Sequence, residues 1–495
     1  MSQENATSKQ PLIRHVNRQQ MSWRAVDVEK LIGEDHPARG IWALVGRLDL
    51  GRFYEDIESS AEEGGRPAFD PQLLISLWVY AYSQGMGSAR EVARRCEFDP
   101  AFQWLTGLQE VNYHTLADFR VEKQKELDEL FTQVLAALSK EGLITLEQVM
   151  QDGTKIKAQA SIRSYRHEDT IREHLERARR RVGEMGDPRS EQTSARTKQA
   201  RERARREQQE RLENALQELE KLQERKPAEK AKNQVRVSSS DPQARVMHQS
   251  DGGLALSYNA QISADAAHGL IVGVAVTQEA NDCLQLLPAV DRVEARLQKK
   301  PQQMVTDKGY TTRETIEVMA KRNIDFLGSR IEENKRGRPV LERLPPSAFV
   351  YDRERDCFIC PEGKPLGYEG RHTKKKGFTY YRYEAEWRDC QSCARKPQCC
   401  PENQKQGRSV VRGEESAAVL AFQQKMASEE AQAQYRRRGR VVEFCHAWIK
   451  SKLGLRQFHV RGLAKVQMEL LWACLTYNLQ HWIRLSKLPA TPAAA

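Results

Sequence analysis

The sequence predicts a multidomain protein whose central unit is an α/β sheet that mixes parallel and antiparallel strands. Two strand patterns come first: "GLALSYNAQISADA" (253–266) alternates apolar and polar residues, and "LIVGVAVTQ" (270–278) is continuously apolar. "QQMVT" (302–306) and "IDFLG" (324–328) then frame the helical pattern "TRETIEVMAKR" (312–322). Strands that follow one another directly favour antiparallel pairing, and the helical crossover favours a parallel pair, so both kinds are expected in one sheet.

The N-terminal region, residues 1–145, is predicted to be a helical domain. "DPQLLISLWVYAYSQG" (70–85) and "AREVARRCEFDPAFQWL" (89–105) place apolar residues at steps of three and four, as amphipathic helices do. A helix-turn-helix around "SQGMGS" (83–88) would suit DNA binding. An ordinary helical bundle explains the same pattern equally well.

Residues 165–244 are expected to form a charged helical insertion. "RERARREQQERLENALQELEKLQERK" (201–226) lacks aromatic residues but carries a short apolar seam at Leu212, Leu216, Leu219 and Leu222. Such a seam fits a helical hairpin or coiled coil, with a turn near residues 183–188. The insertion is either a solvated hairpin or an arm that contacts DNA or a second subunit.

The composition favours a polyanionic partner. Lys and Arg number 79 against 68 Asp and Glu, a formal net charge of +11, which points most simply to nucleic acid; a well-solvated surface is the alternative. No apolar run approaches the ~20 residues of a membrane helix, and the N-terminus has no apolar signal region, so we expect a cytoplasmic protein, nucleoid-associated when bound to DNA.

Two short apolar runs each lead into an aspartate, in "VMQDG" (149–153) and "MVTDKGY" (304–310). Turn chemistry alone explains one such motif. Two of them, Asp152 and Asp307, predict carboxylates placed at strand ends, where a rigid sheet edge can hold the oxygen ligands that Mg²⁺ prefers.

A third acid is expected from "YRRRGRVVEFCHAWIK" (435–450). On a helix, Arg440, Glu443, Ala447 and Lys450 share one stripe, while apolar residues cover the other side. Glu443 would complete the metal site, and Lys450 and Arg440 would hold phosphate oxygens. Taken alone, this stripe is better explained by surface ion pairs.

Together, "DGTKI" (152–156), "YNAQ" (258–261), "TDKGY" (306–310) and the basic Tyr-Arg-Glu-Lys helix resemble the DDE transposases of bacterial insertion sequences. "HPARGIWALVGRLDL" (36–50) is similar to the helical N-terminal domain of that group. The resemblance implies a ribonuclease H-like catalytic domain built from residues 146–164, 245–330 and 431–488, with a disordered tail at 489–495.

The resemblance also implies the site. Asp152, Asp307 and Glu443 would be the catalytic acids and would hold two Mg²⁺ (or Mn²⁺) ions. The family spacing fits from Tyr435 to Arg438 and from Glu443 to Lys450, but one residue too many separates Arg438 from Glu443. We therefore expect Arg440 to be the main phosphate-binding arginine, with Lys450, Arg438 and Tyr435 as further contacts to DNA phosphates.

The function that follows is DNA transposition. Such a protein binds the terminal inverted repeats of its own element, pairs two ends as a homodimer, cleaves double-stranded DNA and joins it to target DNA. Two alternatives stay open: a metal-dependent nuclease of the same fold that cuts without joining, and a non-catalytic DNA-binding regulator derived from a transposase.

Residues 331–430 are expected to be a zinc-binding insertion. Cys357 and Cys360 form "CFICPEG", and Cys390 and Cys393 form "CQSC", so two thiol pairs could hold one tetrahedral Zn²⁺, with Cys399 or Cys400 replacing one ligand. Ten cysteines in 495 residues are too few for a disulfide scaffold. The rival interpretations are disulfides and buried, inert thiols.

Overall fold

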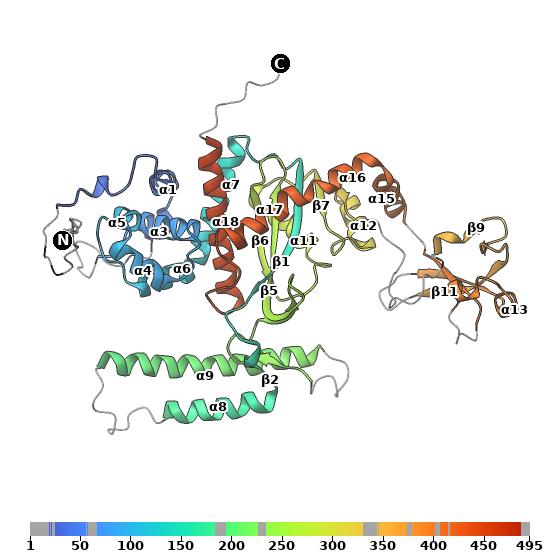
Figure 1. Cartoon of the computed structure of the whole chain (residues 1–495), viewed down its shortest axis with the longest axis horizontal. Helices are drawn as coiled ribbons and strands as arrows, with labels where there is room; N and C mark the ends of the chain where they lie inside the picture. Colours follow the sequence, from blue (N-terminus) through green and yellow to red (C-terminus); the bar gives the residue numbers. More distant parts are fainter. Residues whose placement is uncertain are drawn as a thin grey trace, which may run out of the picture.

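The computed structural model describes residues 25–55, 67–183, 195–225, 234–329, 346–373, 379–400, 406–413 and 416–486, and the single residues 19, 21, 57 and 344 (Figure 1). The predicted tail at 489–495 and the expected turn of the charged insertion, at 184–188, lie outside these residues. None of the helices within the described part of the chain combines the length and the apolar character needed to cross a membrane.

A six-stranded mixed sheet forms the centre of the molecule. Its strands run in the order β4-β5-β1-β7-β8, and β6 also pairs with β5. β1 is antiparallel to β5 and parallel to β7, and β7 is parallel to β8. This arrangement confirms the predicted α/β class. The strands are β1 (Gln148–Lys157), β4 (Arg245–His248), β5 (Leu254–Asp265), β6 (Ile271–Thr277), β7 (Gln303–Thr306) and β8 (Asp325–Leu327).

One strand is longer than the sequence pattern indicated. We expected β1 to end at Asp152-Gly153, but it continues to Lys157. The reason is its second neighbour: β1 pairs with β7 only as far as Gln151, whereas β5 stays paired with it from Val149 to Lys157. Asp152 is therefore still paired with β5, but it lies one residue beyond the last pair that β1 forms with β7.

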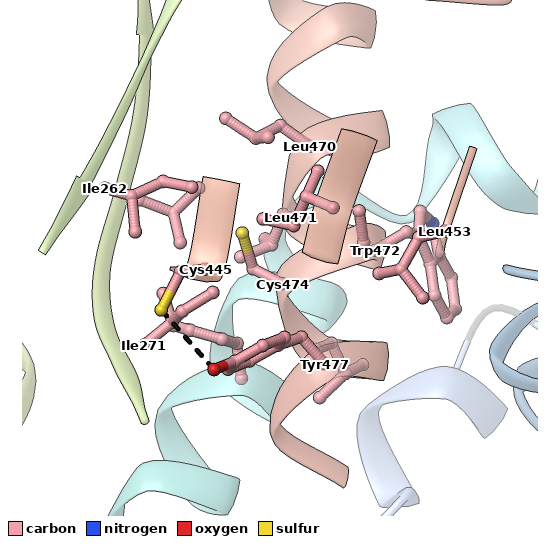
Figure 2. Close-up of a cluster of buried hydrophobic side chains, with 14 of the residues drawn as sticks. Ile262, Ile271, Cys445, Leu453, Leu470, Leu471, Trp472, Cys474 and Tyr477 are labelled. Atoms are coloured by element: carbon pink, nitrogen blue, oxygen red, sulfur yellow. Dashed lines mark hydrogen bonds between the residues drawn. The ribbon is translucent and has the colours of Figure 1, made fainter. Parts of the chain in front are cut away.

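Helices cover the sheet and connect it to the rest of the chain. α11 (Leu286–Leu297) packs on β5 and β6, α17 (Arg438–Ser451) on β1 and β5, and α18 (Leu463–Ser486) on β6. Figure 2 shows how α17 is anchored: Cys445 lies with Ile262 and Ile271 of the sheet and Cys474 of α18. The Cys445 thiol also donates a hydrogen bond of 3.4 Å to Tyr477 Oη. α12 (Arg313–Lys321) links β7 to β8.

The N-terminal helices pack beside α18 (Figure 1). Eleven residues of α3 are buried, because α1 and α18 both pack against it. The described elements of this region are a 3₁₀ turn (Val28–Lys30), α1 (Pro37–Val45), α2 (Gly51–Tyr54), α3 (Pro71–Ser83), α4 (Ala89–Phe98), α5 (Pro100–Thr106), α6 (Tyr113–Glu122) and α7 (Gln124–Lys140).

The charged insertion contains α8 (Glu168–Gly183) and α9 (Ala195–Glu224), which lie antiparallel. Arg179 of α8 pairs with Glu213 of α9 at 3.0 Å, and Gln223 of α9 donates a hydrogen bond of 3.0 Å to Glu168 of α8. The two helices therefore run in opposite directions. Leu212 and Leu219 of the predicted seam are buried against α8. β2 (Tyr165–Arg166) and β3 (Val237–Ser238) pair at the base of the insertion.

A second, five-stranded antiparallel sheet carries the cysteine-rich segment and lies at the other end of the molecule from the N-terminal helices (Figure 1). Its elements are a 3₁₀ turn (Pro346–Ala348), β9 (Val350–Asp352), β10 (Cys357–Ile359), β11 (Pro365–Thr373), β12 (Thr379–Ala385), α13 (Trp387–Gln391), α14 (Lys396–Cys399) and β13 (Ser409–Gly413). α15 (Ala417–Ala427) and α16 (Glu429–Arg436) lead back to α17.

Candidate active site

Asp152 and Asp307 lie next to each other across two parallel strands. Gln151 of β1 and Thr306 of β7 form the last residue pair of that ladder, and each aspartate follows directly. Apolar residues before them, such as Met150 and Val305, are fully buried and fix both strands in the core. The sheet itself therefore determines the relative positions of the two carboxylates.

The third predicted acid, Glu443, approaches from α17. Its side chain is 52% exposed, whereas that of Asp152 is 14% exposed, so the glutamate borders the site from the solvent side. Arg438 lies between the two acids: its guanidinium is 3.4 Å from Asp152 Oδ2 and 3.1 Å from Glu443 Oε1. The structure thus brings Glu443 and Asp152 to a common cation.

Burial makes Asp152 an unusual carboxylate. Its pKa is raised to about 6, first because the group is removed from water and then because Asp307 and Asp282 are negatively charged neighbours; Arg438 opposes the shift. Because burial disfavours the charged form of this carboxylate, a bound cation would stabilise that form strongly.

A fourth acid, Asp282, completes this acidic region and was not predicted from the sequence. Its Oδ1 accepts hydrogen bonds from Asn259 Nδ2 at 2.7 Å and Gln261 Nε2 at 2.6 Å, and Lys155 Nζ lies 3.6 Å away. Asn259 and Gln261 are almost completely buried in β5, so their amide groups require partners. The two amide side chains of "YNAQ" were therefore the sequence signal that a polar partner such as Asp282 lies nearby.

Gly153 makes room for this network. A Cβ atom at position 153 would lie 2.4 Å from Gln261 Nε2 and 2.5 Å from Asp282 Oδ1, too close for any side chain. Tyr310 joins from the other motif, since its hydroxyl donates to Gln261 Oε1 at 2.6 Å. The three short motifs that contain these residues are therefore parts of one hydrogen-bonded unit.

Lys450 reaches the same face of β1 as Asp152. Its ammonium donates a hydrogen bond of 2.6 Å to Thr154 Oγ1, and its pKa is lowered by burial and by the nearby cations Arg456 and Lys155. His446, one turn earlier on α17, places Nε2 3.9 Å from Asp152 Oδ2. Burial lowers the pKa of His446 to about 3, so its ring stays neutral beside the acids.

The remaining predicted phosphate contacts fall in different places. Tyr435 is half-buried at the end of α16, and the Arg438 guanidinium lies 5.9 Å from the centre of its ring. Arg440 is exposed, and the structure gives it no ion pair with Asp152 or Glu443 among the described contacts. The arginine that meets the acids is Arg438.

The donor set of the site suits a hard divalent cation. The carboxylates of Asp152, Asp307 and Glu443 offer the oxygen ligands that Mg²⁺ and Mn²⁺ take. They are not gathered into a finished cage: no three His, Cys, Asp or Glu side chains within the described residues form a metal-binding group as they stand. Arg438 fills the gap between Asp152 and Glu443, so a metal ion there would have to displace its guanidinium.

The structure separates one predicted zinc ligand, Cys357, from the others, which the sequence spacing did not indicate. Cys360, Cys390, Cys393, Cys399 and Cys400 all line one cavity in the second sheet domain. Cys357 is buried in β10 and does not line that cavity. All ten cysteines of the chain are described as free thiols.

Comparison with known protein families gives two matches. Residues 359–483 match the family described as "Transposase DDE domain", and residues 26–122 match the "Transposase domain (DUF772)". The first match contains Glu443 and Lys450 but neither Asp152 nor Asp307; the second covers the N-terminal helices through α6. A search of curated proteins found no match. The two family matches confirm the resemblance drawn from the sequence motifs.

Proposed function

We propose that this chain, which its two transposase domains place among the DDE transposases of insertion sequences, cleaves DNA at the ends of a mobile element and joins those ends to target DNA. The observation that carries the proposal is the register of Asp152 and Asp307 on neighbouring parallel strands, with Glu443 brought toward them by α17. A non-catalytic regulator would have no physical need for three acids held this way.

Asp152, Asp307 and Glu443 are the proposed ligands of two Mg²⁺ or Mn²⁺ ions. When bound, such ions would activate a water molecule or a 3′ hydroxyl of the DNA and would neutralise charge on the phosphate under attack. Around them, Asp282 fixes Asn259 and Gln261, which in turn fix the strand that carries Asp152. His446 stays neutral, with its Nε2 3.9 Å from Asp152 Oδ2.

Two cations are proposed to hold DNA phosphates beside the acids. Lys450 is anchored to Thr154 on the same strand as Asp152, so its ammonium has a fixed position for a phosphate oxygen. Arg438 takes the role first expected of Arg440, because it lies at the acids and its fork of donors suits two phosphate oxygens. Tyr435 supports the Arg438 guanidinium through its ring.

The proposed partners are the terminal inverted repeats, target DNA and a second copy of this chain. Pairing two ends requires two active sites, which a homodimer supplies. The formal charge of +11 favours a salt-sensitive contact with the DNA backbone.

The deciding experiment offers the chain two DNA ends that carry the inverted repeats flanking its gene, together with a target plasmid and Mg²⁺. Joined products support a transposase. Cleaved ends without joined products would indicate the nuclease of the same fold. Retention of the DNA ends without cleavage, in either Mg²⁺ or Mn²⁺, would indicate the regulator.

A further inference from the structure

Five thiols surround one small cavity in the second sheet domain. Cys360 follows β10, whereas Cys390, Cys393, Cys399 and Cys400 come from the segment that contains α13 and α14. The cavity has a volume of about 230 Å³. Cys360, Cys390 and Cys399 also pack against the same apolar core of this domain.

The backbone turn that follows Cys360 directs a main-chain amide at the sulfur of this residue. A tight turn pairs the Cys360 and Lys364 main chains at 2.9 Å, and Gly363, with φ +73°, completes the turn. Within that turn the Lys364 amide donates a hydrogen bond of 3.3 Å to Cys360 Sγ. Main-chain amides aimed at sulfur favour the charged thiolate that binds metals over the neutral thiol.

Cys390 repeats the arrangement from the other side of the cavity. The Arg408 amide donates to Cys390 Sγ at 3.4 Å, and the Cys393 amide donates to Cys390 O at 3.4 Å, which bends the Cys-x-x-Cys segment into a turn. Two thiols on separate segments, each with an amide donor, are the pattern of a metal-binding pair of knuckles.

The domain has little else to hold these segments together. Among the described residues of this domain, the apolar cluster contains six buried side chains, those of Phe349, Phe358, Leu366, Tyr383, Ala385 and Val410. α13 has five residues and α14 has four, too short to be stable helices without tertiary support. Small cores of this kind are usually completed by a disulfide or a metal ion, and the thiols here are free.

We propose that the domain binds one structural Zn²⁺ through Cys360, Cys390, Cys393 and Cys399. This set replaces Cys357 of the sequence prediction with Cys399. Successive side chains of a strand point to opposite faces. In β10, Phe358 faces the apolar core against which Cys360 also packs. Cys357, the residue before Phe358, therefore points to the opposite face. Cys393, whose amide closes the turn begun at Cys390, is the proposed fourth ligand, and Cys400, whose thiol contacts those of Cys390 and Cys399, is its rival for that position.

The four thiols have to move inwards to bind the ion. Zn–S bonds are about 2.3 Å long, and no three donors among the described side chains already form a metal-binding group. The segments that carry these thiols already line a common cavity, and the proposal requires the side chains to rotate toward its centre. The proposal is independent of the proposed DNA chemistry, since none of these cysteines contacts the acids of the active site.

The test is metal analysis of the full chain, expressed in a reducing cytosol and purified without chelator. We expect about one Zn per chain. Cys360→Ser, Cys390→Ser, Cys393→Ser and Cys399→Ser should each lose most of the zinc, whereas the matched variants Cys357→Ser and Cys400→Ser should keep it. A wild-type chain that takes up no zinc even after addition of Zn²⁺ overturns the site, and loss of zinc from Cys400→Ser but not from Cys393→Ser overturns the fourth ligand.

Co²⁺ substitution gives a second measurement that does not depend on how well each variant folds. Replacement of Zn²⁺ by Co²⁺ in the wild-type chain should produce the sulfur-to-metal absorption of four thiolates in tetrahedral geometry. Chelation should remove it and make residues 346–413 more sensitive to protease, with no change in the cleavage of the N-terminal helices. A Co²⁺ spectrum without thiolate absorption would contradict the proposed ligands.

Discussion

Asp152 and Asp307 occupy equivalent positions on adjacent parallel strands, each one residue beyond the last pair of the β1–β7 ladder. Their separation is therefore a property of the sheet and not of two flexible loops. A change of charge at either position should leave the strands in place, because the buried residues before them carry the packing.

Asp152→Asn, Asp307→Asn and Glu443→Gln should each reduce cleavage of terminal-repeat DNA by roughly 10²–10⁴-fold, since each removes a metal-binding charge at nearly constant shape. Binding of the same DNA, measured by fluorescence anisotropy, should change little. Near-normal cleavage by any one variant would remove that residue from the set of catalytic acids.

Asp152→Asn should also stabilise the fold at pH 8. The carboxyl has a pKa of about 6 in the folded chain, above its ordinary value of 3.8. Between pH 3.8 and about pH 6 the folded state binds more protons than the unfolded state. The free energy of unfolding therefore falls progressively as the pH rises through this window. Asparagine avoids that cost, on the order of 1–3 kcal/mol. Thermal unfolding should show a higher Tm for the variant at pH 8 and a smaller difference at pH 4.5; an equal or lower Tm at pH 8 contradicts this account.

Lys450→Ala should weaken strand transfer or DNA binding by about 10-fold or more, because a charge-assisted contact to phosphate is worth about 1.5–3 kcal/mol. Lys452→Ala is the matched control: Lys452 follows the end of α17, is exposed and has no contact with β1 among the described hydrogen bonds. Equal losses in the two variants would mean that the region is a general basic surface.

Arg438→Ala should impair strand transfer more than Arg440→Ala. Arg438 alone of the two pairs with Asp152 and Glu443 among the described contacts, while Arg440 is exposed. The comparison is best made at several Mg²⁺ concentrations, since loss of a cation that competes for the acids should lower the Mg²⁺ requirement while it weakens phosphate binding. A larger defect in Arg440→Ala would restore the arginine expected from the sequence.

Asp282→Ala should reduce cleavage by about 10-fold or more, because two buried amide donors, Asn259 and Gln261, lose their acceptor. Asp291→Ala, in an exposed ion pair with Arg322, serves as the control and should behave as wild type. Asp282→Asn should recover part of the loss if the acid acts by hydrogen bonding. No recovery, together with a raised Mg²⁺ requirement, would assign its charge to metal binding instead.

The sequence was sufficient to predict the sheet and the position of Asp152 and Asp307 after buried strand residues, because both depend on local patterns; the catalytic role of the two acids stays a prediction. Buried runs such as "LIVGVAVTQ" identify strands wherever they fall. The length of β1 was not predictable in this way, since it depends on pairing with β5, more than a hundred residues away. Asp282 was missed for the same reason: it stands in a loop, and only the amides of β5 give it a role.

The sequence and the structure favour different arginines of the predicted set for the main phosphate contact. A single continuous helix through 435–450 favours Arg440 by its angular position. In the structure α16 ends at Arg436 and α17 begins at Arg438, and it is the Arg438 guanidinium that pairs with Asp152 and Glu443. The spacing of Cys357 and Cys360 predicted a metal-binding knuckle, whereas in the structure Cys357 lies in β10 and Cys360 follows that strand.

The anchoring of α17 has a consequence for synthesis on the ribosome. Glu443 is held by a helix whose buried side rests on Cys474 and Tyr477 of α18, so the third acid is positioned only when almost all described residues have been made. A nascent chain that ends before Leu463 would expose the N-terminal helices and both aspartates while Glu443 has no fixed place. We expect a fragment of residues 1–462 to be inert in cleavage, and addition of a peptide spanning 463–486 to restore activity. If so, the order of translation delays DNA breakage until α18 has been made.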